Sequence, residues 1–253
     1  MSITYQIGID RRIKVQWLEY TAGLAISEYN QKEIRAYLDQ FLQEQLSGEG
    51  KTHRGCRQKT ITVLLKTWAI VPQECESLRN EGLSLLSKTP ENEHLIIHWG
   101  MIMTVYPFFR SIAETVGRLF RLQNTVSLQQ IQRRIKEQYG ERPTVSYAAQ
   151  KIIRSFVDWG VLLDTDKKGV YQKPKPIQIN NPQTAAWITE ALLISKNRQS
   201  SALKDLIKSP ALYPFELPIP NTKDLENNKR LELSRQNLAD DMVTLRKPIH
   251  KAP

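Results

Sequence analysis

The sequence contains little cysteine and none of the glycine-rich motifs that mark nucleotide-binding enzymes. Its 253 residues include only two cysteines, Cys56 and Cys75, and they follow no repeated spacing. A disulfide-bonded secreted protein is therefore not indicated. A P-loop, a dinucleotide-binding fingerprint and a nucleophile elbow are all missing, and the serines have no evident histidine partner. We therefore expect no catalysis, no cofactor and no small-molecule substrate.

Long hydrophobic runs are also missing. The longest apolar stretch, residues 95–109, is too short to cross a bilayer and is interrupted by His98, Gly100, Thr104 and Pro107. The first residues lack the charged, apolar and small segments of a signal peptide. We therefore expect a cytoplasmic protein without a membrane partner.

A metal site has only weak support. His94 and His98 are spaced i, i+4, so both rings could lie on one helix face and share a metal ion. The HEXXH motif of zinc enzymes is absent, however, and the other histidines and cysteines are scattered. Asp164 and Asp166 fall in an expected turn, where acidic residues are common for local reasons. We therefore expect no bound metal.

Acidic residues are outnumbered by basic ones. The chain has 36 lysines and arginines against 26 aspartates and glutamates, a formal net charge of +10. Such an excess favours a polyanionic partner through counterion release and electrostatic steering. The cations concentrate in two segments: residues 50–73 contain five and no acid, and residues 118–154 contain eight against two acids. Two basic segments predict a composite binding surface.

Residues 125–175 have the spacing of two helices followed by a basic hairpin. In the first helix, Ser127 and Gln130 match a capping box and Gly140 marks the end. Arg133 and Arg134 fall outside its apolar face, so we predict that they contact phosphate.

The second helix is expected to follow Arg142, Pro143 and Thr144, with Thr144 capping its free N–H groups, and to end at Gly160. Its apolar stripe, with spacing i, i+3, i+4, i+7 and i+10, comprises Ala149, Ile152, Ile153, Phe156 and Trp159. The opposite face carries hydroxyl, amide and cationic groups that can address bases and phosphates, namely Ser146, Tyr147, Gln150, Lys151 and Arg154. The alternative is an ordinary solvated helix.

A hairpin is predicted next, with strands over 161–163 and 170–172 and a turn over 164–169. Its tip carries Lys167 and Lys168, which would approach phosphate.

The rest of the chain is predicted to be mostly helical. Residues 20–46 and 91–122 have helical periodicity, the latter broken at Pro107, whereas residues 51–73 begin as a basic loop and continue as a buried helix or a strand. The candidate phosphate contacts in this basic segment are Lys51, Arg54 and Arg57, and the alternative is a cationic loop without a partner.

The residues after Pro176 are expected to form two short helices and then an extended strap, because four prolines between 209 and 220 exclude a regular helix. Beyond residue 220 the chain is polar, and the apolar residues around 231–233 and 242–245 predict a small hairpin.

The segment 127–175 resembles the winged helix-turn-helix superfamily in its order of elements. We therefore expect a mainly α (α+β) fold, with a helical N-terminal region packed on a winged helix-turn-helix and a C-terminal helical and extended-strap segment. The expected boundaries are a helical domain at 1–123, the winged helix-turn-helix at 124–176, a helical pair and strap at 177–220, and a polar tail with a hairpin at 221–253.

The whole chain, more loosely, looks like the small "A" component of bacteriophage-exclusion (BREX) defence systems. The shared features are a helical N-terminal part, the basic segment at 51–66, an apolar middle at 98–109 and a winged module. This resemblance implies a bacterial, non-enzymatic DNA-binding subunit that works beside other proteins, although the extension after Pro176 departs from it. We predict duplex DNA as the partner, and a protein-docking adaptor is the competing prediction.

Overall fold

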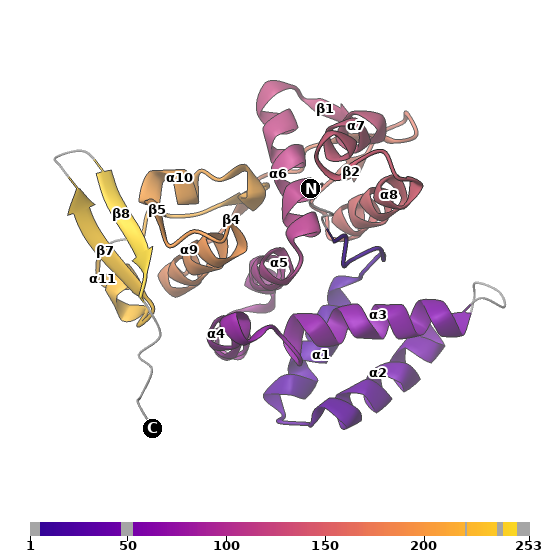
Figure 1. Cartoon of the computed structure of the whole chain (residues 1–253), viewed down its shortest axis with the longest axis horizontal. Helices are drawn as coiled ribbons and strands as arrows, with labels where there is room; N and C mark the ends of the chain where they lie inside the picture. The colour runs from indigo at the N-terminus through magenta and orange to yellow at the C-terminus, as the bar shows by residue number, and fades with distance from the viewer. Residues whose placement is uncertain (1–5, 47–52, 221, 237–239, 247–253) are drawn as a thin grey trace.

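The structure, a computed structural model, describes residues 6–46, 53–220, 222–236 and 240–246. The described part is mainly helical and contains small sheets, in agreement with the expected mainly α (α+β) class. Figure 1 shows α5 (His94–Val105) between the N-terminal helices, the segment from α6 to β3, and the C-terminal elements. This central place explains why α5 is apolar on nearly all sides, since a helix surrounded by protein needs no polar face.

The N-terminal region consists of α1 (Val15–Ile26), α2 (Gln31–Gln45), α3 (His53–Trp68) and α4 (Glu76–Leu86). Short 3₁₀ turns lie at Gln73–Cys75 and Glu91–Glu93. The segment expected to begin as a basic loop is already helical from His53, and the part that could have been a helix or a strand belongs to the same helix, α3. Its threonine hydroxyls bond to carbonyls one turn earlier, as Thr67 does to Val63 at 2.9 Å, so these polar groups are satisfied inside a helix.

The break expected at Pro107 is confirmed. It separates α5 from α6 (Pro107–Leu122), whose first residue is this proline. A proline is tolerated at a helix start because its missing N–H group would have no partner there. The residue before it, Tyr106, has an extended backbone, as a residue before proline prefers.

Residues 125–172 form β1 (Thr125–Ser127), α7 (Leu128–Tyr139), α8 (Pro143–Asp158), β2 (Leu163–Asp164) and β3 (Val170–Gln172). The three strands form an antiparallel sheet in the order β1-β3-β2. Both predicted helices and the capping box of α7 are confirmed. The expected cap at Thr144 is wrong, because α8 already begins at Pro143, a residue suited to the first helical position, and Arg142 is its N-cap.

The first predicted hairpin strand is wrong in its extent. The N–H groups of Val161 and Leu162 bond to the Phe156 carbonyl at 2.8 and 3.1 Å, and both side chains are buried. These residues therefore close the end of α8, after Gly160 with its positive φ of 70°, and leave only two residues for β2.

The C-terminal elements are β4 (Ile177–Gln178), α9 (Pro182–Ser195), β5 (Ser200–Ala202), α10 (Leu203–Ile207), a 3₁₀ turn at Pro210–Leu212, β6 (Phe215–Glu216), α11 (Thr222–Asn227), β7 (Leu231–Gln236) and β8 (Asp240–Leu245). Strands β4 and β6 pair in parallel, and the predicted hairpin is the antiparallel pair β7–β8, with β5 on the other side of β8. The proline-rich segment lies on the body of the protein. Trp99 donates its indole N–H to the Ala211 carbonyl at 2.8 Å.

A buried ion pair connects the C-terminal elements to the helices. Glu190 of α9 is buried and accepts hydrogen bonds from Arg230 at 2.5 and 2.8 Å and from Asn228 at 2.8 Å. Arg230 also bonds to Glu81 of α4 at 2.7 Å. These hydrogen bonds hold Asn228 and Arg230 against α9 and α4, and thereby fix the position of the chain just before β7. Within the described part of the chain, none of the helices combines the length and the apolar character that a membrane span needs.

Candidate nucleic-acid interface

Helix α8 has one buried face and one solvent-facing face. The five residues of its predicted apolar stripe are all buried. On the other face, Tyr147 is 46% exposed, Gln150 is exposed and Lys151 is half-buried. The Lys151 ammonium lies over the Tyr147 ring, 5.0 Å from its centroid, where the cation is attracted to the π-electrons. Ser146 is half-buried, and its backbone carbonyl accepts a hydrogen bond from Gln132 of α7 at 2.9 Å, so it belongs to the α7–α8 contact.

Arg154 connects α8 to the hairpin β2–β3. Its guanidinium donates to both carboxylate oxygens of Asp164, at 3.1 and 3.2 Å. Burial raises the pKa of the neighbouring Tyr171 phenol, an effect that Arg154 opposes. The exposed face of α8 and the hairpin are thus joined at this ion pair, and Arg154 is less accessible than the helical spacing alone suggests.

The remaining predicted cations of this region lie on the surface. The side chains of Arg133 and Arg134 are 80% and 60% exposed, and each approaches Glu137, at 3.5 and 3.2 Å. Exposed pairs of this kind contribute little free energy, so both guanidinium groups can exchange Glu137 for another anion. Lys167 and Lys168 are exposed in the turn between β2 and β3.

The second basic segment differs from the expectation. Lys51 lies outside the described residues, and Arg54 is described only as part of the backbone of α3. Arg57 faces α2 and bonds to Asp39 at 2.7 Å, in a pair that is only partly exposed. Its charge is therefore largely compensated within the protein, which weakens its prediction as a phosphate contact. Among the described side chains of α3, the exposed cations are Lys59 and Lys66.

Lys59 borders a groove between α3 and the beginning of α8, which we call the α3–α8 groove. Its volume is 690 Å³, and its lining residues are Gln6–Asp10, Lys59, Arg142–Thr144 and Tyr147. The lining contains two exposed cations, Lys59 and Arg142, and one carboxylate, that of Asp10, which pairs with Arg11 at 3.4 Å. Sequence reasoning assigned these two cations to separate basic segments and could not place them at one groove.

The N-terminal arm, residues 6–13, forms part of this groove and is fixed to α8. Ile13 donates its backbone N–H to the Ser155 hydroxyl and accepts a bond from the Trp159 indole, both at 2.8 Å. Arg12 forms two bonds of 2.5 Å to the carboxylate of Asp158. Such a bidentate pair fixes orientation as well as distance.

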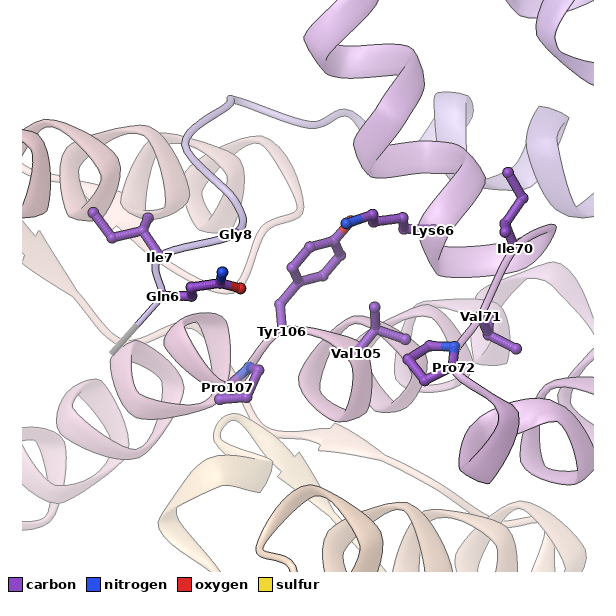
Figure 2. Close-up of a pocket in the computed structure, with 10 residues that line it drawn as sticks. All are labelled: Gln6, Ile7, Gly8, Lys66, Ile70, Val71, Pro72, Val105, Tyr106 and Pro107. Carbon is purple, nitrogen blue, oxygen red and sulfur yellow. The ribbon is translucent and has the colours of Figure 1, made fainter. Parts of the chain in front are cut away.

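Tyr106 fixes the same arm relative to α3. Its hydroxyl donates to the Val63 carbonyl of α3 at 3.1 Å, and burial raises the pKa of this phenol, so it remains a neutral donor. Figure 2 shows its ring between the arm and α3, beside a smaller cavity of 330 Å³ that Lys66 also lines. Gly8 has a positive φ of 66°, and a Cβ atom there would lie 3.2 Å from the ring. The two sides of the α3–α8 groove are therefore connected through buried contacts.

The two histidines that could have shared a metal ion share a carboxylate instead. Glu19 of α1 lies 3.0 Å from His94 Nδ1 and 2.9 Å from His98 Nε2. His98 is fully buried, and its Nδ1 accepts a bond from the Trp68 indole at 3.1 Å, so its proton is on Nε2, toward Glu19.

The charges of this cluster follow from its burial. Burial lowers the pKa of His98 below its ordinary value, although Glu19 acts in the opposite direction. Burial alone would raise the pKa of Glu19, but hydrogen bonds and charges from His98 and His94 outweigh it and lower that pKa. The two histidines of α5 thus connect this helix to Glu19 of α1, and His98 also connects it to Trp68 of α3.

No protein-family model, curated protein or solved structure matches this chain. A function for this chain is therefore inferred from the geometry of the surface described above.

Proposed function

We propose that residues 124–176 form a winged helix-turn-helix and that the protein binds duplex DNA without catalysis. The order β1, α7, α8, β2 and β3, together with the sheet order β1-β3-β2, supports this proposal, with α6 packed against α7 and β1. In this fold α8 is the recognition helix and the hairpin β2–β3 is the wing.

The observation that carries the proposal is the Arg154–Asp164 ion pair, because it joins the exposed face of α8 to the wing. One continuous surface then offers an aromatic, an amide and a cationic side chain on α8, namely Tyr147, Gln150 and Lys151. Such groups can contact base edges in a major groove. Arg133 and Arg134 on α7, and Lys167 and Lys168 on the wing, are assigned to phosphates, which position a protein without reading sequence.

The wing provides the test. Changing Lys167 and Lys168 together to alanine removes two exposed cations at a turn, so stability should remain within about 0.5 kcal/mol. Affinity for duplex DNA should fall about equally for all sequences, and the slope of log K against log salt should become shallower by about 0.9 for each lost phosphate contact. The measurement is duplex binding across a salt series.

The matched control is the double change of Lys223 and Lys229 to alanine. Both lysines are exposed and lie in or next to α11, at the opposite end of the molecule from α8 (Figure 1). The control removes the same charge and should leave binding nearly unchanged. If the wing variant binds DNA with unaltered affinity and slope, the wing is not part of the binding site, and loss of a co-purifying protein from that variant would favour the adaptor function.

The resemblance to the small "A" component of bacteriophage-exclusion systems extends the proposal to a subunit of a bacterial phage-defence assembly. A host that carries the complete system should then lose phage restriction when the wing variant replaces the wild-type protein. Restriction that persists, although the variant has lost DNA binding in vitro, would contradict this extension.

A further inference from the structure

A cluster of charged side chains lies where α6 meets the residues that follow α9 and α10. We propose that this cluster binds a compact phosphate anion: inorganic phosphate, pyrophosphate or the phosphate chain of a small nucleotide. We call it the α6 cluster, and its members are Arg110, Glu114 and Arg118 of α6 with Lys196 and Arg198 after α9. The inference does not depend on DNA binding, because these residues lie outside α8 and the wing.

The α6 part of the cluster gathers its charges on one carboxylate. Arg110, Glu114 and Arg118 are spaced four residues apart, so they lie along one side of the helix. Arg110 Nη1 lies 3.1 Å from one oxygen of Glu114, and Arg118 Nη2 lies 3.5 Å from the other. The Nε–H group of Arg110 has no acceptor among the described residues. One carboxylate cannot satisfy all the N–H donors of two guanidinium groups, so donors remain for a second anion.

A close contact between α6 and the 3₁₀ turn at Pro210–Leu212 brings the other part of the cluster beside the helix. The turn packs against α6 at Gly117, where a Cβ atom would overlap the Pro210 carbonyl oxygen. Ser209 precedes this turn and accepts a hydrogen bond from Lys196 Nζ at 3.1 Å. The Lys196 ammonium is therefore held in place before any ligand arrives, which reduces the entropy cost of binding.

The electrostatics of Lys196 show that the cluster is strongly positive. Lys196 is half-buried, and burial lowers the pKa of its ammonium group. Glu114 opposes this effect, whereas the positive charges of Arg110, Arg198 and Arg118 lower the pKa further. With Lys196 protonated, the five side chains carry four positive charges and one negative charge. A bound anion would relieve the repulsion among the cations.

The arrangement favours a compact anion over a duplex. Arg110 and Lys196 are half-buried, whereas Arg118 and Arg198 are exposed, so a small anion can contact recessed and exposed cations together. A guanidinium group matches two phosphate oxygens with two parallel donors, and an ammonium group adds a point charge. In a duplex the charges are instead distributed along each strand. Figure 1 shows α9 and α10 on one side of α6 and α7 and α8 on the other, so the cluster faces away from α8.

The test is a double variant, Arg118→Ala with Arg198→Ala, which we call the cluster variant. Both side chains are exposed, so the fold should persist. The probe is pyrophosphate, titrated calorimetrically into the full-length protein at an ionic strength fixed with sodium chloride. The cluster variant should bind pyrophosphate at least about tenfold more weakly, because hydrogen bonds between charged groups are lost. The Lys223/Lys229 control removes the same charge and should bind like wild type.

A second variant should act in the opposite direction. Glu114→Gln keeps the size of the side chain but removes the negative charge beside the bound anion, so pyrophosphate should bind about fivefold more tightly. Its matched control is Glu226→Gln, which makes the same change at an exposed position of α11 and should leave the affinity unaltered. Circular dichroism and thermal unfolding of every variant check the fold.

The source of the phosphate is identified by two further probes. Adenosine triphosphate and inorganic tripolyphosphate have the same phosphate chain, and both should lose affinity in the cluster variant. Tighter binding of the nucleotide would assign the site to a nucleotide, and equal binding would assign it to a free phosphate compound.

Three outcomes would overturn the inference. The first is pyrophosphate binding that is absent, or that neither the cluster variant nor Glu114→Gln changes relative to its control. The second is a loss of duplex affinity in the cluster variant that exceeds the loss in the Lys223/Lys229 control, because the cluster would then belong to the DNA interface; the proposed function would stand. The third is a glutamate-rich peptide that binds more tightly than pyrophosphate and is released by the cluster variant, which would indicate an acidic protein partner.

Discussion

Helices α3 and α8 border the same groove and both carry cations, but their surroundings differ. Helix α8 has a buried stripe on one face and polar groups on the other. Helix α3 contacts α1, α2 and α5, and its consecutive residues Val63, Leu64 and Leu65 are all buried. Hydrophobic periodicity in a sequence therefore identifies a helix that packs on one face only. It does not identify a helix that is surrounded by several other elements, because apolar residues then occur on more than one face.

The two helices also use their arginines similarly. Arg57 of α3 bonds to Asp39, and Arg154 of α8 bonds to Asp164, whereas Lys59 on α3 stays exposed. A planar guanidinium matches a carboxylate with two donors, which makes arginine suited to joining elements. A count of cations therefore overestimates the charge that remains for a partner.

The largest expected effects come from the buried faces. Phe156→Ala on α8 should lower the free energy of unfolding by about 3–5 kcal/mol, and Leu64→Ala and Leu65→Ala on α3 by about 2–5 kcal/mol each, because each leaves a cavity. Tyr147→Ala, on the exposed face of α8, should cost much less. Denaturant unfolding measures all four. A small loss of unfolding free energy in Leu65→Ala would show that α3 packs on one face only, as α8 does.

Loss of the indole hydrogen bonds should have a smaller effect. Trp68→Phe on α3 leaves His98 Nδ1 without its donor, and Trp159→Phe on α8 leaves the Ile13 carbonyl without its donor. Each should cost about 1–3 kcal/mol, since an unsatisfied buried polar group remains. Only the Trp159 variant should loosen the arm, which amide hydrogen exchange at Ile13 and Trp17 would reveal. Equal exchange in both variants would contradict this role of the arm.

Stability should depend on pH through the cluster beside α3. Because the pKa of His98 is lowered from 6.5, the unfolded chain binds more protons below about that pH, and stability should decrease as the pH falls below it. The lowered pKa of Glu19 gives stability that is present above 4.5 and is lost as the pH falls through its folded value. In His98→Gln, which keeps a donor and an acceptor, the first decrease should disappear. Urea unfolding between pH 7 and about pH 5 tests this.

The smallest expected effects come from the arginine partners. Asp39→Asn on the α3 side and Asp164→Asn on the α8 side each remove a carboxylate from a partly exposed pair, so stability should change by about 1 kcal/mol or less. Each variant should bind duplex DNA slightly more tightly, with a steeper salt slope, because Arg57 or Arg154 regains its charge. Tighter binding only in Asp164→Asn would place α3 outside the interface.

Local features of this protein could be predicted from its sequence. The stripe of α8, the capping box at Ser127, the break at Pro107 and the hairpin β7–β8 all depend on neighbouring residues. The helical state of α3 could not be chosen, because β-branched residues and threonines favour neither state clearly. The strand expected over 161–163 was wrong because the end of α8 uses the backbone donors of two of these residues.

The sequence by itself determined the composition of the candidate interface: an excess of cations, an amphipathic α8 and a lysine-bearing hairpin. The tertiary structure alone decided which of these cations remain accessible. Arg57 meets Asp39 across 18 residues of chain, Arg12 meets Asp158 across 146, and Lys59 and Arg142 come to the same groove. The physical reason is that spacing along a helix or strand fixes only nearby geometry. Contacts between distant segments depend on how the whole core packs.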